Sequence, residues 1–374
     1  MKAIQQKSKK TILWLVPSVL ALVSVVFAIF SLVMSGLLPT LYVVILCVFS
    51  AIALLLTFFL AIKQFKRRQL VARIFSVILS VITIATVVFG LYALNRGLGA
   101  VDGITTDKNA VQVDTSKSFN VFISGIDSYG DISTKSRSDV NILATVNPDT
   151  RNILLTTVPR DAYVKIPLGG NNQYDKLTHA GIYGVEASMG SVANLLDTKV
   201  DAYVRINFTS FIESIDKIGG VTINNPTAFT SYGESFPAGE IKLDGKRALV
   251  YSRERKNLAA GDIDRGKNQA RVIQGVVDKI SSSSSLGEYN SFLDILSDSV
   301  QTNLSSGTVR ALINQQLANP GSWSTEQNTL TGKGQTGGLK SYAMPNAELY
   351  MYVLNEQSVA DAKKQIVNHM NARP

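Results

Sequence analysis

Three long apolar stretches dominate the first quarter of the chain. Residues 11–62 contain no charged side chain, and this run is too long for a single membrane span of about 20 residues. Glycine and proline near its middle divide it, so the pattern predicts helices over 12–34 and 41–62. A third apolar run predicts a helix over 74–94. We expect all three to cross a membrane. The alternatives, a cleaved signal peptide or apolar core helices, fit three successive runs poorly.

After residue 94 the pattern changes to short apolar runs separated by turn residues. Alternating Val, Ile, Leu and Phe positions predict strands, and longer runs of helical spacing predict helices. The predicted strands are 119–124, 139–147, 152–158, 201–206, 221–223 and 248–252. The predicted helices are 184–196, 208–218, 262–280, 286–304, 308–317 and 358–371. We expect a polar loop over 319–338.

Local signals define several of these boundaries. The turn Asn147-Pro148-Asp149-Thr150 lies between the second and third strands, which are therefore expected to form a hairpin. Asn207 is an expected N-cap, and Gly219-Gly220 is expected to end the helix that it begins.

Strands that alternate with helices predict an α/β fold. We expect a membrane anchor of three helices over 1–94 and a linker over 95–117. One α/β/α domain with a central mixed sheet would then occupy 118–374.

The distribution of charge predicts the topology and excludes one class of partner. The chain carries 37 Lys and Arg and 28 Asp and Glu, a net charge of +9. Nine of the basic residues and none of the acidic ones lie in residues 1–94, so residues 95–374 have no net charge. A nucleic-acid-binding domain is therefore disfavoured. Basic residues precede the first helix and separate the second from the third, whereas the loop between the first and second has no charge, which predicts a cytoplasmic N-terminus and an extracytoplasmic domain.

Cysteine and histidine are too scarce for several kinds of site. The one cysteine, Cys47, lies in an apolar run, where we interpret it as a small lipid-facing residue. Because the chain has a single cysteine, an intrachain disulfide framework and cysteine-based zinc sites are excluded. The two histidines, His179 and His369, leave little for a histidine-rich metal site, and we expect His179 to be structural.

The candidate chemistry lies at the ends of predicted strands. Asp127 follows the first strand, Arg137 and Asp139 begin the second, and Arg160-Asp161 follows the third. Ligands of open α/β sheets bind at such strand ends. Asp127 and Asp139 are candidates for holding Mg²⁺, which takes one or two carboxylates with phosphate oxygens. The alternative is that these aspartates only cap turns.

Further basic residues suggest a phosphate site. Arg253 and Arg255 are two apart, which on a strand would place them on the same face. Arginine forks suit phosphate. Asp262, Arg265 and Gln269 share one face near the start of a predicted helix, where anions bind readily. Solvated surface positions are the alternative for both groups and for the lone Lys176. The chain has no Gly-x-Ser-x-Gly or Walker-A motif, which weakens serine-hydrolase and nucleotide-binding interpretations.

Together these segments resemble the LytR–CpsA–Psr family of cell-wall assembly enzymes over about residues 115–282. The matching segments are, in order, Phe122–Asp127, Arg137–Asn141, Val158–Val164, Asp175–Ala180, Ile218–Val221, Leu243–Leu249, Tyr251–Arg255 and Asp262–Gln269. The resemblance implies a phosphotransferase that moves a glycopolymer, such as teichoic acid or capsular polysaccharide, from a polyprenyl-pyrophosphate carrier to peptidoglycan. It also implies a phosphodiester product, assistance by Mg²⁺, and a central sheet with an apolar pocket for the lipid.

The resemblance also assigns roles to residues of this chain. It implies that Asp127 and Asp139 bind the metal and that Asp262 orients an arginine. The side chains that it places at the pyrophosphate are Arg137, Arg160, Arg253, Arg255 and Arg265, with Gln269 beside them and Lys176 as a weaker substrate contact. The expected partners are the lipid-linked glycan, peptidoglycan and the lipid bilayer. The expected location is the cell membrane.

Other functions remain open at this stage. One is a non-catalytic protein that binds a lipid pyrophosphate and regulates envelope assembly, and another is a polyprenyl-pyrophosphate hydrolase in which water replaces the acceptor. A DNA-binding attenuator is disfavoured by the uncharged outer domain.

Overall fold

The computed structural model describes residues 2–35, 40–62, 69–104, 110–282 and 299–374. They form two compact units. One comprises residues 1–99 with 310–319, and the other comprises 100–309 with 320–374.

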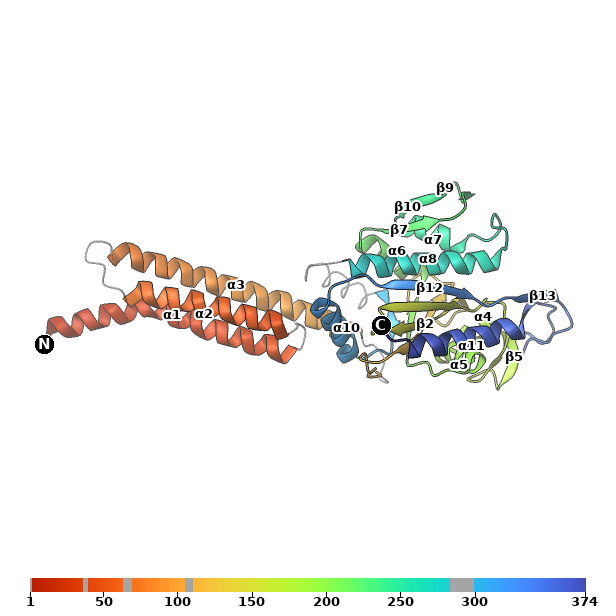
Figure 1. The fold of residues 1–374 in the computed structure, drawn as a ribbon, viewed down its shortest axis with the longest axis horizontal. Helices are drawn as coiled ribbons and strands as arrows, with labels where there is room; N and C mark the ends of the chain where they lie inside the picture. Colours follow the sequence, from red (N-terminus) through yellow and green to blue (C-terminus); the bar gives the residue numbers. More distant parts are fainter. Residues whose placement is uncertain (1, 36–39, 63–68, 105–109, 283–298) are drawn as a thin grey trace. The chain divides into compact units, whose positions relative to one another are not determined.

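Three helices lie where the apolar runs predicted them (Figure 1): α1 (Lys2–Ser35), α2 (Thr40–Ile62) and α3 (Gln69–Ile104). Two windows are long and apolar enough to cross a membrane, Val16–Val33 and Ile74–Tyr92. In α2 the corresponding window among the described side chains, Val43–Thr57, is shorter. Ala21, Val25 and Leu54 pack together between α1 and α2. Within the part of the chain that the structure describes, there are therefore two candidate spans rather than the three that the sequence predicted.

Both outer helices are longer than their apolar runs. α1 begins at Lys2 rather than near residue 12, and α3 continues to Ile104, ten residues into the predicted linker. The part of that linker from residue 110 onward also has defined contacts. Val113 is buried, and its amide donates to Thr308 Oγ1 at 2.9 Å. The residues added at the start of α1 include Ala, Lys and Gln, which lose little side-chain freedom in a helix.

A mixed sheet of six strands forms the centre of the second unit, in the order β11-β6-β1-β2-β3-β12. β1 pairs parallel with β6 and β3 with β12, whereas the remaining pairs are antiparallel. The strands are β1 (Phe119–Ile126), β2 (Ser138–Asn147), β3 (Asn152–Thr157), β6 (Ala202–Ile206), β11 (Gln301–Thr302) and β12 (Ser324–Thr329). The predicted hairpin of the second and third strands is confirmed.

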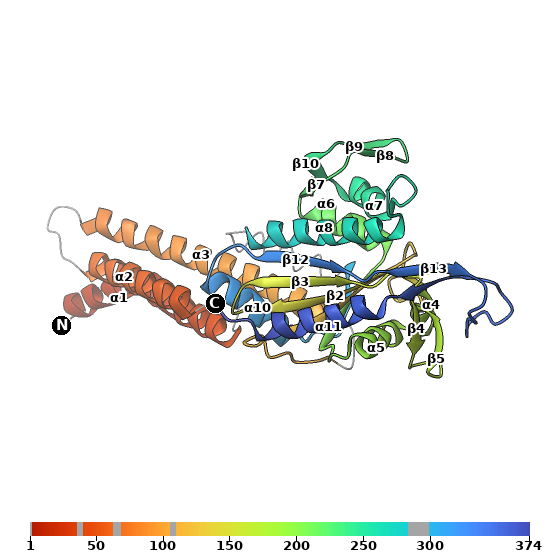
Figure 2. The same ribbon diagram turned by 45° about the vertical axis from the view of Figure 1, so that its right-hand side comes forward.

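Helices cover both faces of this sheet. Neighbouring residues of a strand point to opposite faces, and both faces carry apolar side chains that must be buried. Phe122 and Leu143 pack with the face covered by α4 (Leu177–Tyr183), α5 (Val185–Leu196) and α11 (Glu356–Asn371). Ile142 and Leu155 pack against α8 (Asp262–Ser281) on the other face. Figures 1 and 2 show these layers. The α/β/α layering with a central mixed sheet is confirmed.

A second core lies beside α8. It is built from α6 (Phe208–Lys217), α7 (Gly245–Arg253) and the short strands β7 (Val221–Asn225) and β10 (Gly239–Leu243). The remaining elements are β4 (Tyr163–Ile166), β5 (Gln173–Lys176), β8 (Phe229–Ser231), β9 (Glu234–Phe236), α10 (Ser306–Ala318), β13 (Gly332–Thr336) and β14 (Tyr350–Leu354).

Several predicted elements need correction. The strand predicted over 248–252 is part of helix α7, and the loop predicted over 319–338 contains strands β12 and β13. Most of the helix predicted over 286–304 lies outside the described residues, and its last part contains strand β11 instead. The N-cap at Asn207 is confirmed, because its side chain accepts from the Ser210 amide at 2.9 Å.

Candidate functional site

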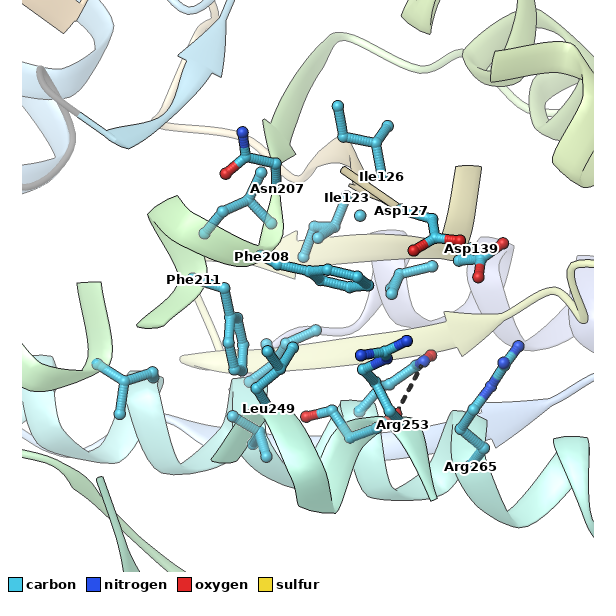
Figure 3. Close-up of a pocket in the computed structure, with 18 of the residues that line it drawn as sticks. Ile123, Ile126, Asp127, Asp139, Asn207, Phe208, Phe211, Leu249, Arg253 and Arg265 are labelled. Carbon is cyan, nitrogen blue, oxygen red and sulfur yellow. Dashed lines mark hydrogen bonds between the residues drawn. The ribbon is translucent and has the colours of Figure 1, made fainter. Parts of the chain in front are cut away.

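A cavity of about 780 Å³ lies between one face of the central sheet and helices α6, α7 and α8. Most of its wall is apolar. The apolar lining residues are Ile123, Ile126, Val140, Val204, Ile206, Phe208, Phe211, Ile215, Leu249, Val272, Ile273, Val276, Val277 and Val300. Figure 3 shows Phe208, Phe211 and Leu249 directed into this space. A ligand with a long apolar part would therefore be removed from water here.

Charged and amide side chains gather on the same wall. Seven of the residues singled out in the sequence line this cavity: Asp127, Asp139, Arg160, Arg253, Arg255, Arg265 and Gln269. Figure 3 shows Asp127 and Asp139 next to each other, with the guanidinium groups of Arg253 and Arg265 directed into the space in front of them. The cavity thus combines an apolar body with a region suited to phosphate.

Two neighbouring strands bring the two carboxylates together. β1 and β2 are antiparallel, with an irregularity in register at Gly125/Ile126, and the Asp127 amide donates to the Arg137 carbonyl at 3.2 Å. A Cβ at residue 125 would lie 2.8 Å from Cβ of Val140. Glycine at this position lets the two strands approach closely enough for Asp127 and Asp139 to share one site.

Arg160 is held by three carboxylates. Its Nη1 donates to Asp139 Oδ2 at 2.7 Å, and its Nε lies 3.7 Å from Asp161 and 3.9 Å from Asp262. Burial would lower the pKa of Arg160, but these carboxylates outweigh it and raise that pKa above its ordinary value. Its guanidinium therefore stays charged and fixed.

The buried Arg265 and the partly buried Asp262 form an ion pair in the first turn of α8. Their side chains meet at 2.7 Å, and the Arg265 side chain is only 8% exposed. Burial lowers the pKa of Arg265 and raises the pKa of Asp262, although each partner opposes the other's shift. Gln269, one turn further, donates to the Ser252 carbonyl at 3.3 Å and so links α8 to α7. Asp262 does not itself line the cavity, so it acts on the site through the two arginines that it contacts.

Arg253 and Arg255 reach the cavity from a helix end rather than from a strand. Arg253 ends α7, and Arg255 lies in the loop that follows. The argument that a strand places them on one face was therefore wrong, although both line the cavity. The guanidinium carbon of Arg253 lies 4.4 Å from the ring centroid of Phe208, which is a cation–π contact.

Glu254 holds the loop that presents these arginines. It is buried, and its carboxylate accepts from the amides of Arg255 at 2.8 Å and Asn257 at 2.9 Å. Burial would raise the pKa of Glu254, but hydrogen bonds from Ser231 and from these amides lower it. The charged carboxylate thus fixes the backbone between Arg253 and Arg255.

Two predicted basic residues lie beside the cavity rather than on its wall. Arg137 Nη2 is 3.6 Å from Asp127 Oδ2, and Lys176 Nζ is 3.0 Å from Asp161 Oδ1. His179 is buried, with its Nδ1 2.8 Å from the buried carboxylate of Asp175. Asp175 also accepts from Ser341 Oγ and from the Ala343 amide, both at 2.7 Å. His179 therefore has the structural role that the sequence suggested.

Sequence analysis missed three residues of the site. Phe208 supports Arg253, Glu254 holds the arginine loop, and Thr178 Oγ1 donates to Asp139 Oδ1 at 3.2 Å. Glu254 could have been noticed in the sequence, because it stands between two arginines that were both expected at one site. A carboxylate in that position is a candidate for holding the backbone that presents them. Nothing in the sequence pairs Phe208 with Arg253, since they lie on different helices.

Comparison with known proteins places these features in context. The model of the LytR_cpsA_psr family matches residues 93–366. The polyisoprenyl-teichoic acid–peptidoglycan teichoic acid transferase TagU of Oceanobacillus iheyensis is 32% identical over 259 residues, which cover 67% of this chain and 76% of the relative. TagU of Bacillus subtilis is 34% identical over 251 residues, which cover 65% and 80%.

Solved structures of members of this family are also similar to this chain. The crystal structure of B. subtilis TagU has a TM-score of 0.53 and 31% identity, and the match covers 69% of this chain and 99% of that one. A structure of TagT bound to LIIa-WTA has a TM-score of 0.54 and 31% identity, with coverage of 68% and 92%.

Proposed function

The chain belongs to the LytR–CpsA–Psr family, and from that premise we propose that it transfers a teichoic acid or related glycopolymer from a polyprenyl-pyrophosphate carrier to peptidoglycan. The observation that carries the proposal is the single cavity with an apolar body and a wall of arginines and carboxylates. The apolar body would bind the lipid, and the arginines would bind its pyrophosphate. The relatives' names support teichoic acid as the polymer.

The reaction that we propose is an in-line displacement at phosphorus. A sugar hydroxyl of peptidoglycan forms a bond to the phosphorus that carries the polymer. The bond from that phosphorus to the lipid phosphate breaks, and its electron pair leaves with polyprenyl monophosphate. The product is a phosphodiester. Positioning and stabilisation of the developing negative charge supply most of the catalysis in such reactions.

The arginines are prepared for that charge. Arg160 and Arg265 are already oriented by Asp139 and Asp262, each at 2.7 Å, so little reorganisation is needed when the leaving phosphate forms. Arg253 and Arg255 would contact the same pyrophosphate from the α7 side, with Gln269 beside them. Arg137 and Lys176 act, in this proposal, at the edge of the site through Asp127 and Asp161.

Asp127 is our candidate for the residue that accepts the hydroxyl proton. It is the less engaged of the two carboxylates, because it lies 3.6 Å from Arg137 whereas Asp139 lies 2.7 Å from Arg160. A carboxylate within reach of the acceptor would take the proton as the new bond forms.

Mg²⁺ is the cofactor that we propose. Asp127 and Asp139 would hold it, and this pair fits the ion, which takes one or two carboxylates with phosphate oxygens and water. Among the described residues no group of three or more His, Cys, Asp or Glu side chains is arranged to hold a metal. The remaining ligands would therefore come from substrate and water. When bound, the ion would neutralise charge on the phosphates.

We further propose that α1, α2 and α3 all cross the membrane, with the N-terminus in the cytoplasm and the catalytic unit outside. The support is the absence of charge in residues 11–62 and the basic residues before α1 and between α2 and α3. A membrane-held enzyme would then meet its lipid-linked donor by diffusion in two dimensions.

The direct test uses the full chain in nanodiscs. It would be incubated with a polyprenyl-pyrophosphate-linked teichoic acid and peptidoglycan oligomers, with and without Mg²⁺, and the product identified by mass spectrometry. We expect Arg160→Ala to lower the rate by about 10²–10³, because one fixed charge donor is lost. Arg373→Ala is the matched control, since Arg373 pairs with Asp149 on the surface.

Outcomes separate the competing functions. Donor binding without product would favour the regulator, and release of lipid monophosphate without transfer would favour the hydrolase. Full activity of Arg160→Ala would contradict the assignment of the site.

A further inference from the structure

A group of tyrosines lies beside the charged network but outside the cavity. We call Tyr163, Tyr174 and Tyr350 the tyrosine platform. Tyr163 and Tyr174 stack, with ring centroids 5.1 Å apart and planes inclined by 26°. Tyr174 is 45% exposed and Tyr350 46% exposed. Such rings present large apolar faces to water, and a ligand that covers them would gain from their burial.

The strand register explains why two of these rings share a surface with lysines. β4 and β5 are antiparallel, with Tyr163 opposite Lys176 and Lys165 opposite Tyr174. Alternate residues point to the same face, so these four side chains cover one face of the ribbon. Val164 and Ile166 point the other way into the core. The Lys165 ammonium lies 5.5 Å from the Tyr174 ring centroid.

The platform is held in place by its surroundings. Tyr163 Oη donates to the Lys340 carbonyl at 3.1 Å. The buried carboxylate of Asp175, on the inner face of β5, accepts hydrogen bonds from Ser341 and Ala343 and so fixes the loop between β13 and β14, which contains Lys340. The Tyr350 ring lies over Gly334 on the paired strand β13, where any Cβ would overlap it. The rings are therefore oriented before a ligand arrives.

Two side chains, Lys176 and Asp161, connect the platform to Arg160. Lys176 Nζ lies 6.0 Å from the Tyr350 ring centroid and 3.0 Å from Asp161, which in turn lies 3.7 Å from Arg160. The Tyr352 amide also donates to the Asp161 carbonyl at 2.8 Å, so β14 is tied directly to the segment after β3. Burial and the Asp161 carboxylate raise the pKa of Tyr350, as this closeness requires. Figure 2 shows β4, β5 and β13 near one another at the end of this unit.

We propose that Tyr163, Tyr174 and Tyr350 form the binding subsite for the sugar chain of the acceptor. This inference rests on the proposed function. The C–H faces of pyranose rings pack on aromatic faces, and phenol and ammonium groups hydrogen-bond to sugar hydroxyls, acetamido groups and carboxylates. A ribbon that alternates tyrosine with lysine matches a chain of N-acetylated, carboxylate-bearing sugars.

The direction of attack favours the acceptor over the donor glycan. In an in-line displacement the attacking oxygen approaches phosphorus opposite the leaving group. The leaving lipid phosphate belongs to the apolar cavity, whose wall includes Arg160 but none of the platform tyrosines. The acceptor must therefore arrive from outside the cavity, and the platform lies there.

The test compares acceptor and donor kinetics in the full chain in nanodiscs. Peptidoglycan glycan oligomers of two and eight sugars would be used as acceptors at saturating donor. We expect Tyr174→Ala/Tyr350→Ala to raise the KM for the longer acceptor roughly five- to tenfold, with kcat and the donor KM little changed. Tyr174→Phe/Tyr350→Phe keeps the ring faces and should retain most of the affinity. Val367→Ala, an exposed change on α11, is the surface control.

Each outcome bears on the inference separately from the proposed function. If wild-type chain forms product but the Ala variant keeps the wild-type acceptor KM, the platform is wrong while the transferase stands. A rise in donor KM alone would assign the platform to the donor glycan and also overturn the inference. If no product forms at all, the inference is tested by measuring direct binding of the eight-sugar oligomer to the wild-type chain and to the Ala variant. Binding of the eight-sugar oligomer by wild type that is lost in the Ala variant would support the platform, and its absence or retention would overturn it.

Discussion

At the scale of the residue, the site is a set of charges that orient one another. The sequence predicted seven of the residues on the cavity wall, because arginines and aspartates at strand and helix ends are recognisable without a structure. It did not predict their partners. Phe208 and Arg253 meet across two helices, and Thr178 reaches Asp139 from α4. Such contacts depend on packing between distant segments, which residue spacing does not encode.

Removal of the Phe208 ring should leave the Arg253 guanidinium less well oriented toward the cavity. A cation–π contact at an exposed site contributes about 0.5–1 kcal/mol, so Phe208→Ala should raise the KM for the lipid donor about two- to fivefold beyond any effect of lost lipid contact. A double-mutant cycle with Arg253→Ala isolates this coupling. Phe208→Tyr keeps the ring and is the control. Strictly additive effects of Phe208→Ala and Arg253→Ala would show that the contact has no energetic role.

The partly buried Asp262 should make stability depend on pH in a defined direction. Burial raises its pKa in the folded chain above the ordinary 3.8, so the folded state keeps this proton to higher pH than the unfolded state. As pH rises from about 3.8 through the folded pKa, this group therefore lowers the free energy of unfolding. Asparagine has no carboxyl group to titrate, so the free energy of unfolding of Asp262→Asn does not fall in this way.

The corresponding measurement is urea unfolding followed by the fluorescence of Trp323. Trp14→Phe would be introduced into both the parent protein and the Asp262→Asn variant, and it leaves Trp323 as the single tryptophan. We expect the free energy of unfolding of Asp262→Asn minus that of the parent to rise across this pH window and then to level off. A difference that falls with rising pH would mean that the folded pKa of Asp262 is depressed rather than raised.

At the scale of the element, the errors have identifiable causes. The run Ala248–Ser252 is continuously apolar apart from its last residue, which suggested a strand. Asp244, however, accepts from the Arg247 amide at 2.8 Å and begins helix α7. An N-cap signal was therefore present but received less weight than the apolar run. β12 was missed because its sequence is polar, and it becomes a strand only by pairing with β3.

The close approach of β1 and β2 gives a test of how the two carboxylates are brought together. Gly125→Ala would place a Cβ 2.8 Å from Cβ of Val140, and overpacking of this kind costs about 1–3 kcal/mol. We expect lower stability and a larger loss of transferase activity than stability alone explains, because Asp127 and Asp139 would move apart. Adding Val140→Ala, which removes the nearest methyl group, should restore part of both. Unchanged activity in Gly125→Ala would show that strand spacing does not control the site.

At the scale of the whole molecule, the order of strands and helices along 118–374 predicted an α/β domain, and the layers of the described residues confirm the α/β fold. The strand order of the sheet was beyond the sequence, since β11 and β12 come from the last quarter of the chain and close both edges. Pairing between such distant segments is set by the shape of the folded core rather than by local pattern.

The number of spans can be tested with the chain's single native cysteine removed. In a Cys47→Ser background, Ser8→Cys places one thiol in the basic start of α1, before its uncharged run, and Ser116→Cys places one after α3. With three spans the two lie on opposite sides, so a membrane-impermeant thiol reagent on intact cells should label only Ser116→Cys. Labelling of both or of neither would indicate an even number of spans.

The measurement that tests the central claim most directly is the mass of the lipid released during transfer. The full chain would be given polyprenyl-pyrophosphate-linked teichoic acid and peptidoglycan oligomers, and the released lipid and the product would be weighed by mass spectrometry. If the arginines stabilise a leaving lipid phosphate, each turnover joins the polymer to peptidoglycan through one new phosphodiester and releases one polyprenyl monophosphate. Release of polyprenyl pyrophosphate, with a product joined without phosphate, would contradict this account.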